Sequence, residues 1–243
     1  MKKKTIRLLI PFLLIGLFYL IPIRFIANYP PYESTSLIRI IYSFLTVNDC
    51  GHLWFLPTLL GIFIIATVLI RMTKQSTLIC IVLMLYILSP YLSSFLLITS
   101  TKYLFFFFMG YFINQYGKQI FSIKAIYHGL ATLGILLIAY VLIFHNENRV
   151  VTTFTSITII ASLYYFMPHR TNRFILWLDK NSFGIYLFHS PLMYIIMNKF
   201  SIIAPPAILV PMNLIFGIGG SLIITYFLRA IKCSFVIGEK NDR

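Results

Sequence analysis

The chain has 243 residues, of which 59% are hydrophobic and only 11% are charged. Soluble domains carry about 25% charged residues, so this composition excludes a soluble globular protein and predicts an integral membrane protein. The formal net charge is +14, yet the basic residues form no contiguous stripe with interleaved aromatic side chains, which argues against a nucleic-acid partner.

Eight apolar segments are long enough to cross a lipid bilayer, which requires about 20 mainly apolar residues in a helix. They cover residues 6–27, 52–70, 77–98, 103–116, 126–144, 151–167, 182–200 and 205–228. The predicted fold class is therefore all-α, a polytopic transmembrane helical bundle of eight spans that forms one membrane domain over residues 1–243. The first segment exceeds the apolar region of a signal peptide and is interpreted as an uncleaved span.

The basic residues are distributed unevenly between the two faces of this bundle. If the segments alternate in direction, 5 of the 20 lysines and arginines fall on one side and 15 on the other. The five are Arg24, Arg39, Lys102, Arg149 and Lys199. Because cytoplasmic loops carry the excess of basic residues, both termini are predicted to be cytoplasmic, with the basic loops facing membrane lipid headgroups. The expected location is the bacterial cytoplasmic membrane.

The first outer connection covers residues 28–50 and contains the turn signal YPPYE before a short apolar pattern. Apolar residues at 37, 40, 41, 44 and 45 fall on one face of a helix. Residues 36–45 are too few to span a bilayer, so we expect an interfacial or re-entrant helix at the outer mouth of the bundle.

A possible acid–base pair follows this helix. Asp49 and His52 are three residues apart, which makes them neighbours on a helix. A carboxylate beside an imidazole fixes the tautomer of the ring and raises its basicity, as a general base requires. The alternative is that Asp49 only caps the helix while His52 and Trp54 anchor it at the membrane interface.

The seventh segment carries an ionisable residue at depth. His189 lies roughly 10 Å from the cytoplasmic boundary at 1.5 Å per residue, and such residues are functional candidates by default. Ser182, Tyr186, His189 and Met193 share one helical face, which should look into the bundle. Pro191 should kink the helix there. The alternative is a neutral histidine whose hydrogen bonds are satisfied by a neighbouring helix.

The remaining polar groups point to no metal. The three cysteines have no CxxC spacing, and none of the acidic residues lies in mid-membrane, which argues against an ion-coupled transporter. His169, Arg170 and Arg173 form a basic cluster on the cytoplasmic side, where guanidinium groups suit phosphate. The alternative is that these residues only belong to the general excess of basic residues in cytoplasmic loops.

With these residues identified, the chain resembles the acyltransferase 3 family of integral membrane acyltransferases. The likeness is carried by KTIRLLIPFLLIGLFYL (4–20), GHLWFLPTLL (51–60), YLFFFFMGYFI (103–113) and NSFGIYLFHSPL (181–192). The resemblance implies transfer of an acyl group, commonly acetyl, from cytoplasmic acetyl-CoA or another acyl-CoA to a hydroxyl of a carbohydrate or glycolipid.

The resemblance also implies which residues act. His52 and Trp54 match the HLWFL motif and would lie at the acceptor end, while Tyr186 and His189 match the late motif. The basic cluster would meet the phosphates of CoA, an inference from charge alone.

The family pattern usually begins with two further helices, the first of which carries the histidine assigned to catalysis. No residue here matches that histidine, so the chain is interpreted as N-terminally truncated relative to the family. His52 with Asp49, and His189, are the substitute catalytic candidates. A transporter or flippase of a lipid-linked saccharide, or a non-catalytic remnant, is the alternative function.

Overall fold

The computed structural model describes residues 2–120, 149–166, 172–200 and 204–239, with the single positions 129, 133, 134, 138 and 140. All regular elements in the described ranges are helices, which confirms the all-α prediction. The chain forms two compact units, one of Met1–Lys102 with Arg173–Arg243 and one of Tyr103–Asn172. Most of the predicted segment 126–144 lies outside the described residues.

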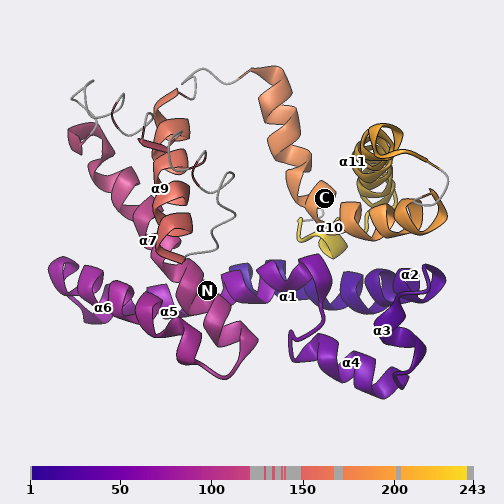
Figure 1. Ribbon diagram of the computed structural model, residues 1–243, viewed down its shortest axis with the longest axis horizontal. Coiled ribbons are helices and arrows are strands. Elements are labelled where there is room, and N and C mark those ends of the chain that lie inside the picture. The colour runs from indigo at the N-terminus through magenta and orange to yellow at the C-terminus, as the bar shows by residue number, and fades with distance from the viewer. Residues whose placement is uncertain are drawn as a thin grey trace. The chain divides into compact units, whose positions relative to one another are not determined.

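The described helices are labelled in Figure 1. In chain order they are α1 (Lys2–Ile15), the π-helical η1 (Gly16–Leu20), α2 (Ile21–Ile26), α3 (Pro30–Glu33), α4 (Leu37–Leu45), the 3₁₀ helix η2 (Gly51–Trp54), α5 (Phe55–Met72), α6 (Gln75–Leu88), η3 (Ser89–Tyr91), α7 (Phe95–Ile120), α9 (Arg149–Phe166), α10 (Arg173–Phe200), α11 (Pro206–Ala230) and η4 (Ser234–Ile237).

Within the described residues, four helical stretches are long and apolar enough to cross a membrane. They are Lys4–Ile26, Gly51–Met72, Phe95–Tyr116 and Pro206–Ala230, and two shorter apolar helices cover Thr77–Tyr91 and Val151–Ile160. The protein is therefore an integral membrane protein by the composition and length of its helices. The total of eight spans and the side on which the termini lie stay predictions.

The predicted boundary between the third and fourth segments is wrong. α6 ends at Leu88, and α7 already begins at Phe95, inside the predicted segment 77–98. The cause is local: Pro90 has no backbone N–H, and the Ser89 hydroxyl donates to the Tyr86 carbonyl at 2.9 Å. As a consequence Lys102 lies within α7 and not in an outer loop.

The start of the predicted seventh segment also needs correction. α10 begins at Arg173, nine residues before the predicted start at Ser182, so the expected connection is helical. The Asn181 side chain donates to the Trp177 carbonyl at 2.8 Å within this first part. Pro191 lies inside α10 and does not end it.

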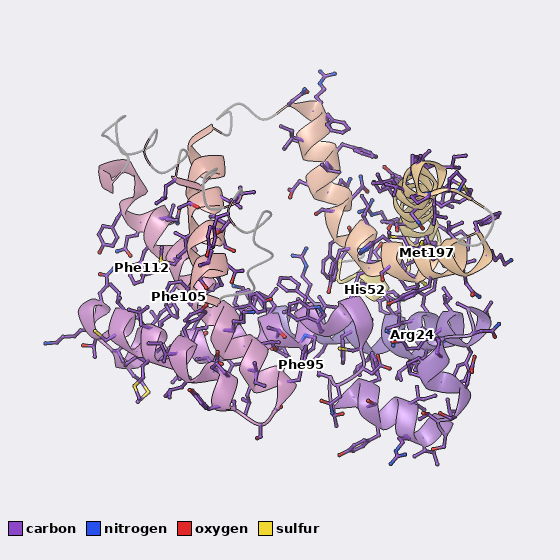
Figure 2. The ribbon with its side chains drawn as sticks, viewed as in Figure 1. Arg24, His52, Phe95, Phe105, Phe112 and Met197 are labelled. Atoms are coloured by element: carbon purple, nitrogen blue, oxygen red, sulfur yellow. The ribbon has the colours of Figure 1, made fainter. Side chains whose placement is uncertain are left out.

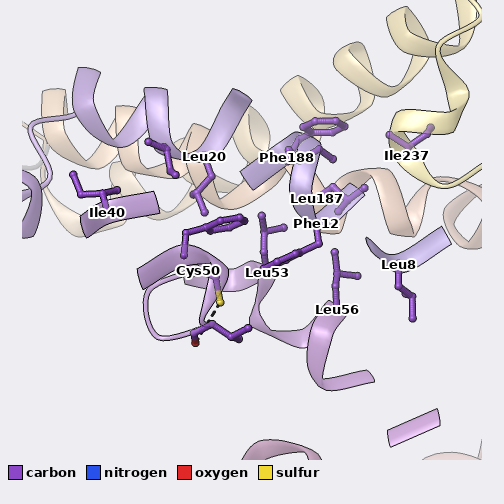
Figure 3. Packing of buried hydrophobic residues seen from close by; sticks show 14 of the residues in the cluster. Leu8, Phe12, Leu20, Ile40, Cys50, Leu53, Leu56, Leu187, Phe188 and Ile237 are labelled. Carbon is purple, nitrogen blue, oxygen red and sulfur yellow. Dashed lines mark hydrogen bonds between the residues drawn. The ribbon is translucent and has the colours of Figure 1, made fainter. Parts of the chain in front are cut away.

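The short helix predicted after the first segment, as an interfacial or re-entrant helix, is present as α4 and packs into the main core; its place in the membrane stays a prediction. Its Phe44 is fully buried and stacks on Phe12 of α1 with ring centroids 4.6 Å apart. Figure 3 shows Phe12, Leu53 of η2, and Leu187 and Phe188 of α10 gathered in the same cluster. The core therefore joins the first helix, the connection after it and α10.

One glycine makes the contact between η1 and α4 possible. Gly16 is buried in η1, and a Cβ atom at this position would overlap the Phe44 ring. Because Phe44 is enclosed and stacked on Phe12, the ring cannot move aside without disturbing the core.

Gly16→Ala should therefore destabilise the protein by about 1–3 kcal/mol, the usual cost of overpacking. The matched control is Gly110→Ala in α7, where an added Cβ meets no atom within 4 Å. The measurement is thermal unfolding in detergent followed by tryptophan fluorescence. A melting temperature that falls for Gly110→Ala and not for Gly16→Ala would contradict this account of the core.

α10 and α11 pack against each other along much of their lengths, from Gly184 with Thr225 to Met197 with Asn213. Small side chains allow this approach: Gly184 of α10 faces Thr225 of α11, and Gly217 lies against His189 and Met193. Asn213, Gly217 and Ser221 recur every four residues on one face of α11 and are all buried, which is typical of a face used for close helix packing.

Arg229 of α11 holds the segment that follows this helix in place. Arg229 donates from Nε to Oε2 of Glu239 at 2.9 Å, from Nη2 to Oε1 at 2.6 Å, and from Nη1 to Oδ1 of Asn181 at 2.7 Å. Asn181 is almost completely buried, and Ile237 of η4 joins the main core. This bidentate pair holds the segment after α11 against α10.

Candidate active site

A buried arginine organises the connection between α2 and η2. Arg24 is only 2% exposed, and its Nη1 donates to Oδ1 of Asp49 at 2.8 Å and to the Tyr32 hydroxyl at 3.2 Å (Figure 2). The guanidinium also lies over the Tyr29 ring at 4.5 Å and 5.7 Å from the Tyr194 ring of α10. One cation therefore joins α2, the following connection and α10 through an ion pair and three tyrosines.

The predicted pairing of Asp49 with His52 is wrong, because the Asp49 carboxylate is bound by Arg24. Asp49 also lies outside the helix that carries His52, because η2 begins at Gly51 and is a 3₁₀ helix. Gly51 has φ +53° and lies so close to Arg24 that an added Cβ would be 2.6 Å from Nη2. No side-chain cap is formed at η2 either, so Asp49 is a counter-ion to a buried cation.

His52 takes its orientation from the backbone of α10 in place of a carboxylate. Its Nε2 lies 3.0 Å from the Leu187 carbonyl, and the Tyr186 hydroxyl donates to the His52 carbonyl at 2.7 Å. Since a carbonyl only accepts, Nε2 carries the hydrogen and Nδ1 has the lone pair. Nδ1 is buried and has no hydrogen-bond partner among the described residues, so it is available as a base.

In His189 the roles of the two ring nitrogens are the reverse of those in His52. Its Nδ1 lies 3.0 Å from the Ile185 carbonyl and 2.9 Å from the Tyr186 carbonyl, so Nδ1 carries the hydrogen and Nε2 is the acceptor. The ring centroid is 5.4 Å from that of His52. The two imidazoles of different helices thus lie side by side, each with one nitrogen held by backbone and one able to take a proton.

The predicted polar face of α10 is brought together only in part. Tyr186 and His189 lie beside His52. Ser182, in contrast, is exposed and donates to the Asp179 carbonyl at 2.8 Å. Trp54 lies next to this region and packs edge-on against Phe95 with centroids 6.4 Å apart.

His189 also lines a groove of about 250 Å³ between α10 and α11. The groove is mainly apolar, but Asn213 contributes a buried Oδ1 with no hydrogen-bond partner among the described residues. His189 therefore has apolar space on its α11 side, and its Cβ lies near Gly217.

The basic cluster predicted on the cytoplasmic side is described only in part. Arg173 is the first residue of α10 and is exposed, while His169 and Arg170 lie outside the described residues. In the described part of the chain there is no group of three or more histidine, cysteine, aspartate or glutamate residues able to hold a metal.

Cys50 is a neighbour of the site but not a nucleophile. It is 2% exposed, and burial raises the pKa of its thiol to about 11, so the group stays protonated at neutral pH. Its Sγ lies 3.8 Å from the Val47 carbonyl. The two histidines are thus the side chains of this site with a ring nitrogen that can act as a proton acceptor.

Arg24 is the site residue that the sequence analysis missed, because it was counted only as an outer basic residue. A detectable signal exists: Arg24 ends an apolar segment, and an acidic residue, Asp49, opens the next one. Charged side chains at such depths are usually paired.

Comparison with known families accounts for nearly all of this chain. The acyltransferase 3 family model, described as an acyltransferase domain, matches residues 1–230. Comparisons with curated proteins and with solved structures gave no match. The matched range includes both histidines, the Arg24–Asp49 pair and all four segments on which the resemblance was based. The chain belongs to the acyltransferase 3 family of membrane acyltransferases.

Proposed function

We propose that this protein transfers an acyl group, acetyl in the first instance, from acyl-CoA to a hydroxyl of a cell-surface carbohydrate or glycolipid. The observation that carries the proposal is the buried Nδ1 of His52, which is held as a lone-pair acceptor by the Leu187 carbonyl. A base in a fixed tautomer is what activation of a neutral hydroxyl requires.

In the proposed reaction the acceptor hydroxyl gives its proton to Nδ1 of His52 while its oxygen attacks the thioester carbonyl carbon. The carbon–sulfur bond then breaks, and the CoA thiolate takes the proton from the imidazolium. An ester and free CoA are the products, and no other reactant is needed. His189, whose ring centroid lies 5.4 Å from that of His52, supplies the second proton acceptor of the site through Nε2 and assists this transfer.

The proposed topology places donor and acceptor on opposite sides. Eight spans with both termini in the cytoplasm make residues 1–243 one membrane domain of the bacterial cytoplasmic membrane. The acyl-CoA enters from the cytoplasm, where the cluster of His169, Arg170 and Arg173 meets its phosphates. The exposure of Arg173 at the start of α10 supports this assignment. The acceptor approaches His52 from the outer side.

The acetate content of cell-surface glycans tests the proposal. Cells that express the chain should release more acetate on mild alkaline treatment than cells without it, and His189→Ala should lower the gain by about 10²-fold, the low end for loss of a proton-transfer group. Ser182→Ala on the same helix is the control, since Ser182 is exposed and bonds only within α10.

Equal acetate content with and without the gene would overturn the proposal. Movement of a labelled lipid-linked saccharide across vesicles without consumption of acetyl-CoA would instead favour a transporter. Reporter fusions at the two chain ends test the topology separately, because opposite sides would exclude an even number of spans.

A further inference from the structure

We propose that a polar pocket in the connection between α2 and η2 binds a saccharide. Its role as the acceptor subsite rests on the proposed function, whereas the binding itself does not. The pocket has a volume of about 500 Å³, within the range of small-molecule sites. The polar and aromatic residues that could contact a ligand there include Tyr29, Tyr32, Tyr42, Arg39, Asn48 and Asp49.

The lining chemistry favours a polyhydroxylated ligand. Three phenol rings offer both a flat apolar face and a hydroxyl group, and they stand beside a carboxylate and an amide. This mixture matches a sugar ring, which alternates C–H faces with hydroxyl donors and acceptors. A hydrocarbon chain would leave these polar groups without partners.

The charge of the pocket favours a neutral ligand over an anion. Asp49 already has the buried cation Arg24 as its counter-ion, so this pair contributes no net charge. Arg39 is the remaining cation among the lining residues, and it is exposed on α4. A phosphate site would instead gather several uncompensated basic groups.

Two of the lining groups are held in place before any ligand binds. Arg24 donates to the Tyr32 hydroxyl and to Asp49, so both are fixed by one buried side chain. Burial raises the pKa of the Tyr32 phenol, so its own hydrogen remains available for donation. Asp49 keeps 31% of its side-chain surface exposed and can still accept from a ligand hydroxyl. Such preorganisation lowers the entropic cost of binding.

The pocket lies close along the chain to the candidate base. Asp49 lines the pocket three residues before His52, and Arg24, the ion-pair partner of Asp49, lies against Gly51. A saccharide held by Asp49 and Tyr32 would therefore sit on the segment that carries the base. This arrangement gives the short helices α3 and α4 a function beyond covering the core.

Saturation-transfer NMR on the full chain in lipid nanodiscs tests the proposal. The probes are glucose, N-acetylglucosamine, maltose and chitobiose, which are soluble and contain no lipid. We expect signals from at least one probe, and about tenfold weaker binding for the double variant Tyr42→Ala/Asn48→Ala, as expected for loss of a ring contact and a hydrogen bond. Both residues are exposed, so the fold should be retained.

The control variant is Tyr91→Ala, which removes another exposed tyrosine, on η3 outside the pocket, and should leave binding unchanged. Absence of signals from all four probes with folded protein would overturn the proposal, and so would equal signals from the double variant. If binding depends on Tyr42 but no acetate is transferred, the subsite stands and the proposed function fails. If transfer is seen without such binding, the proposed function stands and the proposed subsite fails.

Discussion

His52→Gln should lower acyl transfer by a factor of about 100 or more while the protein stays folded, because a positioned base contributes about 10²–10⁴ to a rate. The glutamine amide can still donate to the Leu187 carbonyl, the partner of His52 Nε2. It has no atom that takes a proton in place of the buried Nδ1. The variant therefore separates the chemical role of the imidazole from its role in joining η2 to α10.

His52→Ala is the companion variant, since it removes both the base and the hydrogen bond to Leu187. Its melting temperature should fall relative to that of His52→Gln, because the Leu187 carbonyl loses its side-chain donor. Transfer is measured by release of CoA from acetyl-CoA with purified protein and an acceptor glycan. Activity of His52→Gln equal to wild type would mean that His52 is only a structural link, and His189 would then be the remaining base.

Local patterns predicted the all-helical fold and the presence of α4, but not the boundaries of α6, α7 and α10. The 3.6-residue period of α4, with Ile40 and Phe44 buried, and the small-residue face of α11 were visible in the sequence. The motifs around His52 and Tyr186 lie in widely separated segments of the chain, and the structure brings them into contact. Such features depend on residues within one or two turns of each other, which is the range over which sequence periodicity carries information.

The hydrogen-bond partners of the polar groups could not be predicted from the sequence in the same way. Arg24 reaches Asp49 across 25 positions, and His52 reaches the Leu187 carbonyl across 135. The first pair replaced the predicted neighbour pair because a buried guanidinium requires a counter-ion more strongly than an imidazole does. A backbone carbonyl as the partner of His52 carries no residue-specific signal, so no sequence pattern could have indicated it.

The second large effect is expected at the buried ion pair. Asp49→Ala should destabilise the protein by about 3–5 kcal/mol, because Arg24 would remain buried without its counter-ion. A loss of this size corresponds to a fall in melting temperature of roughly 10 °C in a chain of this length. The measurement is thermal unfolding of the purified protein in detergent, followed by tryptophan fluorescence.

A double-mutant cycle separates the cost of the unpaired charge from other effects. In Arg24→Met/Asp49→Ala both charges are absent, and methionine can fill part of the space among the three tyrosines, so much of the stability should return. Arg39→Met on α4 is the control for loss of a surface cation, with an expected change within about 0.5 kcal/mol. If Asp49→Ala were as stable as Arg39→Met, Arg24 would have to be solvated in the native protein. The tyrosines and Asp49 would then lose the cation that now holds the connection between α2 and η2 against α10.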